Sequence, residues 1–304
     1  MSHRINVLIV GASGMLGHTL FGRLFENDKL DTHATVRSVS ELSRWFTDDH
    51  LLKIHGGIDA DNFDSVLAVL AQIKPDVVIN CVGVIKQLPA AEDPVVCIAT
   101  NALFPHRLAV ACKAAGARLV HISTDCVFSG EKGDYRETDR SDATDLYGRS
   151  KFLGEVTSDH CVTLRTSIIG HELKGGYGLV EWFLSRKGPV KGFTNAIYTG
   201  FPTIEIARII EKYIICDMNL KGLYQVASEP ISKYELLELI AAQYGKKIEI
   251  IPFGDFHCYR SLNSDKFRNA TGYSAPAWPE LIAEMHNDYV TSPWYRHKLR
   301  EGSH

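Results

Sequence analysis

Short apolar runs rich in valine and isoleucine alternate with longer amphipathic stretches along the first half of the chain. Apolar runs of this length predict β-strands, and apolar residues spaced by three and four positions predict helices. The expected strands cover residues 5–10, 32–36, 51–55, 76–81, 118–123 and 162–166, and the expected helices cover 15–25, 62–73, 98–115 and 147–156. Strands that alternate with helices in this way are typical of a parallel sheet covered on both faces. The pattern therefore predicts an α/β fold with a doubly wound parallel sheet.

The pattern becomes irregular after Gly170, where glycines cluster and aromatic residues become more frequent. We expect a smaller C-terminal lobe to begin there. A further amphipathic stretch at 203–215 and an apolar run at 222–227 predict that the chain returns to the first sheet, so that the two lobes are interleaved. The first lobe is expected to cover residues 1–169 with 198–228 returning to it, and the second to cover 170–197 and 229–304.

Composition and charge argue against several classes of partner. The 304 residues carry 33 Lys and Arg against 36 Asp and Glu, so the chain lacks the basic surplus typical of nucleic-acid binding. No uninterrupted apolar run approaches the roughly 20 residues that a membrane helix needs. The seven cysteines are widely spaced, without a CxxC pair or a Cys/His cluster of metal-ligand spacing. We therefore expect a cytoplasmic protein with reduced thiols, no metal, no nucleic acid and no membrane partner.

The first predicted strand runs directly into a glycine-rich segment that opens the first helix. Glycines at this spacing let the backbone turn sharply and approach a pyrophosphate, which the free N–H groups of the helix N-terminus can bind. A glycine-rich turn without a ligand is the alternative, but its position between a strand and a helix favours a dinucleotide. The sequence thus predicts a Rossmann domain whose cofactor contacts Gly11, Ser13, Gly14, Met15, Leu16 and Gly17.

The end of the second predicted strand carries a basic residue, Arg37, twenty residues after Gly17. Proteins that bind NAD commonly place an acid here, which accepts a hydrogen bond from the ribose 2′-hydroxyl. A guanidinium beside Ser38 suits a 2′-phosphate instead, and Arg44 is a candidate second contact. We therefore expect NADP, bound as NADPH, with NAD as the second choice and a solvated surface arginine as the alternative interpretation of Arg37.

A tyrosine and a lysine, Tyr147 and Lys151, lie four residues apart in a predicted helix and therefore share one face. A cation beside a phenol lowers its pKa, which makes the phenol a better partner for proton exchange with a substrate oxygen. This spacing alone is common in exposed helices. The preceding buried strand, however, ends in a hydroxyl pair, Ser123 and Thr124, which supports a catalytic interpretation.

The glycine turn, the hydroxyl pair and the Tyr-Lys pair resemble the extended short-chain dehydrogenases/reductases that act on nucleotide-activated sugars. Segments 123–128, 164–167 and 260–264 are similar to those of dTDP-4-dehydrorhamnose reductases, and the resemblance covers nearly the whole chain. It implies that Thr124 hydrogen-bonds the substrate oxygen, that Tyr147 is the acid/base and that Lys151 holds the nicotinamide ribose. It also implies cofactor contacts from Asn80, Cys81, Val82, Gly83, Asn101, Ser123, Thr166, Ser167 and Ile168. Asp125, Cys126, Trp182 and Arg260 are the expected substrate-binding residues.

This chain departs from those relatives at some positions. Cys126 stands where the rhamnose reductases usually have tyrosine, and residues 84–87 do not match theirs. Sugar-nucleotide 4,6-dehydratases have a glutamate at the position of Cys126, and epimerases usually keep an acid where this chain has Arg37. GDP-fucose synthases, which resemble this chain at Arg37, have a cysteine that acts in epimerisation. Asn80 and Asn101 could also be ordinary structural polar residues.

The resemblance implies NADPH-dependent reduction of a nucleoside-diphosphate-linked 4-keto-6-deoxy sugar in deoxysugar or surface polysaccharide biosynthesis. One alternative is an epimerase or a bifunctional epimerase-reductase of the same family. Another is a non-catalytic NADP-binding regulatory subunit similar to that of methionine adenosyltransferase. A homodimer is compatible with the sequence.

Overall fold

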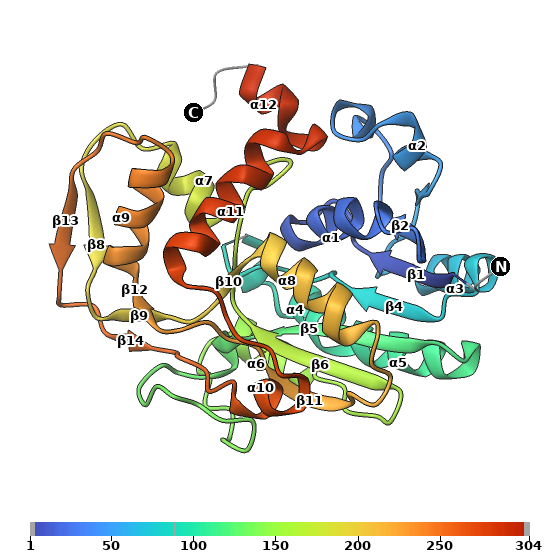
Figure 1. The fold of residues 1–304 in the computed structure, drawn as a ribbon. Helices are drawn as coiled ribbons and strands as arrows, with labels where there is room; N and C mark the ends of the chain where they lie inside the picture. Colours follow the sequence, from blue (N-terminus) through green and yellow to red (C-terminus); the bar gives the residue numbers. More distant parts are fainter. Residues whose placement is uncertain (1–3, 88, 301–304) are drawn as a thin grey trace.

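A seven-stranded parallel sheet forms the centre of the computed structural model, which describes residues 4–87 and 89–300. Its strands lie in the order β11-β6-β5-β4-β1-β2-β3 (Figure 1). The order reverses between β1 and β4, and in such sheets ligands bind beside the carboxyl ends of the strands at this point. The strands are β1 (Ile5–Val10), β2 (Leu30–Thr35), β3 (Ile54–His55), β4 (Val77–Asn80), β5 (Arg118–Thr124), β6 (Cys161–Thr166) and β11 (Gly222–Gln225). The predicted doubly wound parallel sheet is confirmed.

Helices cover both faces of the sheet because side chains alternate along each strand. In β1, Val7 and Ile9 belong to one apolar core, and Leu8 and Val10 belong to a second core on the other face. Residues of helices on each face contribute to these cores. On the first face they include α1 (Met15–Phe25) and α8 (Thr203–Ile209), and on the second α3 (Phe63–Ile73) and α5 (Phe104–Ala115).

The third predicted strand, 51–55, was wrong over most of its length. Asp48–Leu51 form helix α2, and only Ile54–His55 form strand β3. Two aspartates lie in the first turn of α2, where negative side chains stabilise the positive end of the helix dipole. Strand β3 pairs only with Ala34 and Thr35 of β2, so the sheet ends in a short edge strand.

The helix predicted at 98–115 begins earlier. Helix α4 (Pro94–Cys97) continues through a π-helical turn, η3 (Ile98–Leu103), into α5. Its start is stabilised by Asp93, whose carboxylate accepts hydrogen bonds from two backbone N–H groups, at 2.8 and 3.3 Å. The continuous segment Pro94–Ala115 is long and apolar enough to cross a membrane, but half of that stretch is buried inside the protein, as in a core helix.

The C-terminal part of the chain lies at one end of the sheet and returns to it once (Figure 1). β11 pairs in parallel with β6, so residues 222–225 join the central sheet as expected. The lobe boundaries at 169, 197 and 228 stay a prediction, and the ends of those ranges, 1–3 and 301–304, lie outside the described residues. The remaining elements are η1 (Leu42–Arg44), η2 (Pro89–Glu92), η4 (Asp125–Val127), α6 (Leu146–Leu153), β7 (Ile168–Ile169), α7 (Leu179–Leu184), β8 (Val190–Phe193), β9 (Ala196–Tyr198), β10 (Phe201–Pro202), η5 (Ile210–Ile214), β12 (Ile231–Ser232), α9 (Lys233–Gln243), β13 (Ile250–Phe253), β14 (Cys258–Tyr259), α10 (Asp265–Thr271), α11 (Trp278–Thr291), η6 (Pro293–Tyr295) and α12 (Arg296–Arg300).

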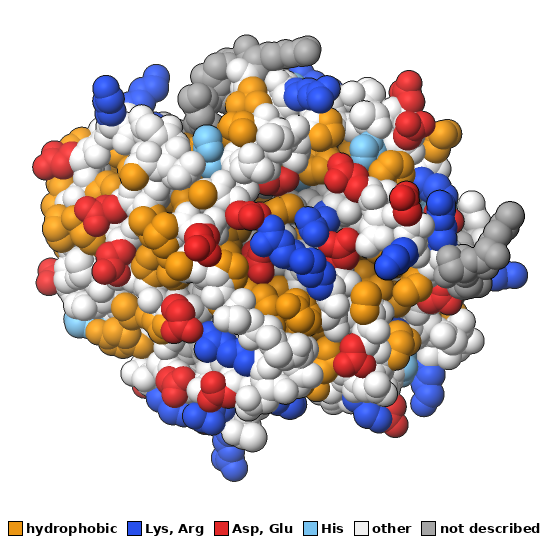
Figure 2. All heavy atoms as spheres, in the orientation of Figure 1, with side chains coloured by type: hydrophobic (Ala, Val, Ile, Leu, Met, Phe, Trp, Pro, Cys, Tyr) orange, Lys and Arg blue, Asp and Glu red, His pale blue; other side chains and the backbone are white. Residues whose placement is uncertain are grey.

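One apolar core runs continuously from the sheet into the C-terminal part. It includes Leu20 of α1, Phe183 of α7, Leu236 of α9 and Tyr289 of α11. The C-terminal part is therefore packed onto the sheet rather than tethered to it. On the face drawn in Figure 2, acidic and basic side chains are mixed, with a small basic group near the centre and no broad basic surface.

Candidate active site

The glycine turn between β1 and α1 has the geometry of an anion-binding loop. Gly11 has a φ of +96°, which side-chain-bearing residues rarely adopt. A Cβ on Gly17 would overlap the Gly11 carbonyl oxygen, so glycine is what lets the helix approach the strand. Gly14 caps α1 without a side-chain hydrogen bond, and no acidic residue lies in the first turn. The first N–H groups of α1 are therefore available to an anion.

The side chains of this turn differ in their exposure. Ser13 and Gly14 are exposed and Met15 is half-buried, so all three can face a bound dinucleotide. Leu16 and Gly17 are buried, and the Leu16 side chain belongs to the apolar core. A contact from Leu16 to a cofactor would therefore come from its backbone.

Arg37 and Ser38 follow β2 and are both exposed. Arg37 forms no ion pair with a described residue, which leaves its guanidinium available to a phosphate. The Ser38 hydroxyl lies 2.6 Å from that of Ser40. Arg44 is also exposed, but it lines a separate cavity of about 580 Å³ together with Trp45 and Arg296. The sequence did not suggest that Arg44 lies beside a residue of the C-terminal helix, Arg296.

Helix α6 brings the predicted acid, Tyr147, to the end of β5. A Cβ on Gly148 would overlap the Cys126 carbonyl oxygen, so the helix lies directly against the segment that follows β5. The Asp145 carboxylate caps α6 by accepting a hydrogen bond from the Gly148 N–H at 2.8 Å. Burial raises the pKa of the Tyr147 phenol, and a hydrogen bond with the Thr124 side chain opposes this rise. The sequence had led us to expect a lowered pKa from Lys151.

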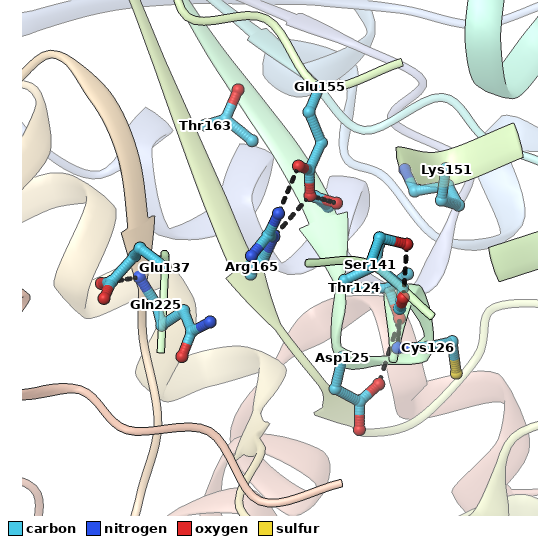
Figure 3. A network of polar contacts seen from close by, with 12 residues as sticks. Thr124, Asp125, Cys126, Glu137, Ser141, Lys151, Glu155, Thr163, Arg165 and Gln225 are labelled. Atoms are coloured by element: carbon cyan, nitrogen blue, oxygen red, sulfur yellow. Dashed lines mark hydrogen bonds and ion pairs between the residues drawn. The ribbon is translucent and has the colours of Figure 1, made fainter. Parts of the chain in front are cut away.

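Thr124 closes β5 and already has local partners. Its hydroxyl donates to an Asp125 carboxylate oxygen at 3.1 Å and accepts from the Cys126 N–H at 3.1 Å (Figure 3). Thr166 lies opposite it in the neighbouring strand β6. Ser123, one residue earlier, is directed to Glu155 instead, because its hydroxyl donates to that carboxylate at 2.7 Å.

Lys151 is buried beside this pair. Its ammonium donates to the Ile122 carbonyl oxygen at 2.7 Å, and burial lowers its pKa to about 8. A Cβ on Gly83 would lie 3.9 Å from the Lys151 Nζ atom and 3.3 Å from the Asn101 side-chain oxygen. Any side chain at position 83 would therefore lie against Asn101 and close to the ammonium.

The two predicted asparagines shape the loop that follows β4. Asn80 accepts a hydrogen bond from the Val82 N–H at 3.0 Å, and Asn101 accepts one from the Val84 N–H at 2.9 Å. Asn101 also donates to the Val84 carbonyl oxygen at 3.2 Å. The sequence assigned both asparagines to the cofactor, but their side chains hold residues 81–84, so any role in cofactor binding acts through that loop.

Three of the predicted substrate contacts lie together. Arg260 donates to the Phe128 carbonyl oxygen at 2.9 Å, and its guanidinium lies 3.7 Å from the Cys126 sulfur. Burial raises the pKa of Asp125 and raises that of the Cys126 thiol to about 12, while the positive charge of Arg260 lowers both. At neutral pH the thiol is therefore protonated.

The fourth predicted contact, Trp182, lines a pocket of about 240 Å³ with Phe193, Lys191 and Lys233. The positive charge of Lys233 also lowers the pKa of Asp125. The two lysines were not singled out in the sequence, because only the fold brings β8 and α9 to this place.

Four further predicted cofactor contacts, Cys81, Val82, Ser167 and Ile168, are half-buried.

A glycine turn at the switch point of a doubly wound sheet, with a threonine and a Tyr-Lys pair nearby, defines a dinucleotide-binding α/β protein. Residues 5–291 match the family described as RmlD substrate binding domain, and the chain belongs to this family. The predicted resemblance to dTDP-4-dehydrorhamnose reductases is thereby confirmed.

Individual relatives carry different names. The chain is 28% identical over 240 residues to a dTDP-4-dehydrorhamnose reductase of Aggregatibacter actinomycetemcomitans, covering 75% of this chain and 76% of that protein. It is 29% identical over 249 residues to methionine adenosyltransferase 2 subunit beta of Danio rerio, covering 77% and 72%. A crystal structure of dTDP-4-dehydrorhamnose reductase from Bacillus anthracis in complex with NADP superposes with a TM-score of 0.76 at 24% identity, covering 95% and 99%.

Proposed function

We propose that this protein reduces a nucleoside-diphosphate-linked 4-keto-6-deoxy sugar with NADPH, in deoxysugar or surface polysaccharide biosynthesis. The observation that carries the proposal is the position of Tyr147, next to Thr124 and one helical turn before a buried lysine, Lys151. A raised phenol pKa suits a proton donor, because the phenol is still protonated at neutral pH. Cytoplasmic location belongs to the same proposal, since the described cysteines are all free thiols.

The residues of the glycine turn fit a dinucleotide, because a Cβ on Gly11 would lie 2.9 Å from the Val82 side chain and one on Gly17 would overlap the Gly11 carbonyl oxygen. This close backbone approach leaves room for a pyrophosphate at the N-terminus of α1. Arg37 and Ser38 would hold the 2′-phosphate, and the lack of a side chain at Gly83 would let the nicotinamide ribose approach Lys151. When bound, NADPH supplies the hydride that the keto carbon receives.

The side chains around Tyr147 would handle the proton and the developing charge. Tyr147 would donate its phenolic proton to the keto oxygen as negative charge develops there. The Thr124 hydroxyl would hydrogen-bond the same oxygen. The Lys151 ammonium, fixed by the Ile122 carbonyl, would stabilise the phenolate that Tyr147 becomes. Arg260, beside Cys126, and Lys233, which lines a pocket with Trp182, would meet the substrate diphosphate.

The test is spectrophotometric. Purified protein is mixed with NADPH and a panel of 4-keto-6-deoxy nucleotide sugars with different nucleosides, and absorbance is followed near 340 nm. The proposal predicts net NADPH oxidation with at least one of them. Tight NADPH binding without oxidation by any of these sugars would instead support the non-catalytic subunit.

A bifunctional epimerase-reductase is the second candidate, and Cys126 favours it. Its sulfur lies 3.7 Å from the Arg260 guanidinium, whose positive charge would stabilise a thiolate formed during proton exchange. Incubation of enzyme and keto sugar in deuterated water without NADPH would show deuterium beside the carbonyl, and Cys126→Ser would not incorporate it. If wild-type protein incorporates none, the enzyme is a simple reductase.

We also propose a homodimer formed by the segment Pro94–Ala115 and helix α6. Val95, Ile98 and Val110 on the first, and Phe152 and Leu153 on the second, are exposed apolar side chains. Glu92 and Asp93 lie at the start of the long helix and Lys113 at its end, so antiparallel pairing with a second copy brings opposite charges together.

A further inference from the structure

A buried ion pair lies directly behind the Tyr147 site. The Arg165 guanidinium donates to both carboxylate oxygens of Glu155, at 2.7 Å each (Figure 3). The two side chains are only 3% and 7% exposed. Ser123 donates a third hydrogen bond to the same carboxylate, also at 2.7 Å. Glu155 is therefore fixed from β5 and from β6 at once.

Stability alone is a weak explanation for this pair. Removing two charges from water costs about as much as their attraction returns, so apolar residues of similar size often serve a core equally well. The Arg165 Nη1 atom, moreover, has no hydrogen-bond partner among the described residues, although it is buried. The Phe128 ring lies 5.1 Å from the guanidinium. The arrangement therefore gives the Glu155 carboxylate three hydrogen bonds while one Arg165 nitrogen stays without a partner among the described residues.

Glu155 continues a series of contacts between α6 and the end of β5. Three consecutive β5 residues are involved: the Ile122 carbonyl accepts from Lys151, the Ser123 hydroxyl donates to Glu155, and Thr124 adjoins Tyr147. α6 and the residues just after it thus contact three consecutive residues at the end of β5. Arg165 of β6 is the register partner of Ser123 in β5. The two neighbouring residues therefore both donate hydrogen bonds to the Glu155 carboxylate.

The nitrogen end of the Lys151 side chain is directed toward Glu155 (Figure 3). The charge of Glu155 raises the pKa of Lys151 against the lowering effect of burial. The other titratable neighbours that act on Lys151 or are acted on by it are Cys81 and His121. Burial raises the pKa of Cys81 to about 12 and lowers that of His121 well below its usual value, so both are neutral near pH 7. Glu155 is thus the acidic side chain whose negative charge favours the charged form of Lys151, and the same carboxylate is ion-paired with Arg165.

We propose that Glu155 is a positioning residue for the reductase site, which holds α6 against β5 and keeps the Lys151 ammonium charged, with Arg165 setting how much of its negative charge reaches the lysine. The proposal deepens the proposed function and rests on it for its catalytic meaning. Its physical content, the charge on Lys151, can be measured without any substrate.

The experiment titrates Lys151 directly. Protein labelled with ¹³C at the lysine ε carbon is followed by NMR between about pH 6 and pH 11, a range that brackets the Lys151 pKa of about 8 and reaches the usual lysine value of about 10.4, and Lys151→Arg identifies the resonance. Glu155→Gln keeps an acceptor for Ser123 but removes the charge, so the Lys151 midpoint is expected to fall by about one pH unit. Arg165→Gln removes the competing cation, so the midpoint is expected to rise. The double variant is expected to lie between them.

The opposite directions separate this role from a structural one. Both single variants break the same ion pair and are expected to lower the unfolding temperature, so a purely structural role predicts destabilisation with no opposed shifts. Ser123→Ala is the matched control, because it removes a hydrogen bond to Glu155 without changing charge and is expected to leave the midpoint in place. Should Glu155→Gln not fold, the rise expected for Arg165→Gln carries the test.

A Lys151 midpoint that stays within about 0.2 units of wild type in the folded variants, well below the shift expected from a neighbouring charge, would overturn the proposal. The NADPH dissociation constant is measured by fluorescence at several pH values. As pH rises and Lys151 loses its charge, this constant is expected to begin to increase at a lower pH in Glu155→Gln than in wild type. If wild-type protein oxidises NADPH with none of the keto sugars, the proposed function fails, while the titration still decides whether Glu155 sets the charge of Lys151.

Discussion

Two glycines of the same turn should respond differently to alanine, because the space around them differs. A Cβ on Gly17 would overlap the Gly11 carbonyl oxygen and lie 2.9 Å from its carbon and 3.0 Å from the Ala12 Cα atom. All three atoms are backbone and cannot rotate away, so α1 must move from the strand. Overpacking of this kind costs about 1–3 kcal/mol. At about 2–4 °C per kcal/mol, Gly17→Ala should lower the unfolding temperature by several degrees.

Gly14→Ala should leave the fold nearly unchanged. Its φ of −78° suits any residue, and a Cβ there would lie 3.5 Å from the Gly11 carbonyl oxygen, an ordinary contact. The added methyl group would occupy the exposed side of the turn, where the pyrophosphate is proposed to approach. NADPH affinity should fall at least about tenfold, which corresponds to about 1.4 kcal/mol. Gly188→Ala is the control, since no atom lies within 4 Å of its Cβ position.

Differential scanning fluorimetry without ligand and fluorescence titration with NADPH separate the two effects. Gly17→Ala should lose stability and affinity, Gly14→Ala should lose affinity alone, and Gly188→Ala should lose neither. Wild-type NADPH affinity in Gly14→Ala would show that the cofactor phosphates bind elsewhere. Wild-type stability in Gly17→Ala would refute the packing argument.

Three further predictions test the rest of the site. Tyr147→Phe should reduce turnover at least about 100-fold, the usual scale of general acid catalysis, with NADPH affinity within a few-fold of wild type; near-normal turnover would contradict the acid role. Arg37→Asp should weaken NADPH more than NADH in parallel titrations, and an unchanged ratio would mean that Arg37 faces solvent. Val110→Asp should convert a dimer to a monomer in light scattering, whereas Leu67→Asp, exposed on α3, should not.

The elements predicted correctly are those whose signals are local. Strand β1 and helix α1 have the predicted bounds because an unbroken apolar run meets a glycine turn at one point in the sequence. The third strand failed because the pairing of Ile54–His55 with Ala34 and Thr35 depends on the neighbouring strand, while the local charges of Asp48 and Asp49 favour a helix. Apolar content alone could not separate the two outcomes.

The site shows the same division between local and long-range signals. The spacing of Tyr147 and Lys151 and the hydroxyl pair at 123–124 could be read from the sequence. The orientation of that pair could not, since Ser123 turns to Glu155 and Thr124 turns to Tyr147. Glu155 and Arg165 are ten residues apart in the chain, in the segment after α6 and on β6, and no local pattern marks them as partners.

Gly148 explains why a motif as short as Tyr147 to Lys151 can still define a site. Any Cβ at position 148 would overlap the Cys126 carbonyl oxygen and lie 2.7 Å from the Ala143 Cβ atom. The helix can therefore reach the end of β5 only with glycine at this point, and that approach is what places the phenol at Thr124. The residue between the two chemical groups thus decides whether they meet a strand end or face solvent. A Tyr-Lys pair that lacks this close approach would share the spacing without the geometry.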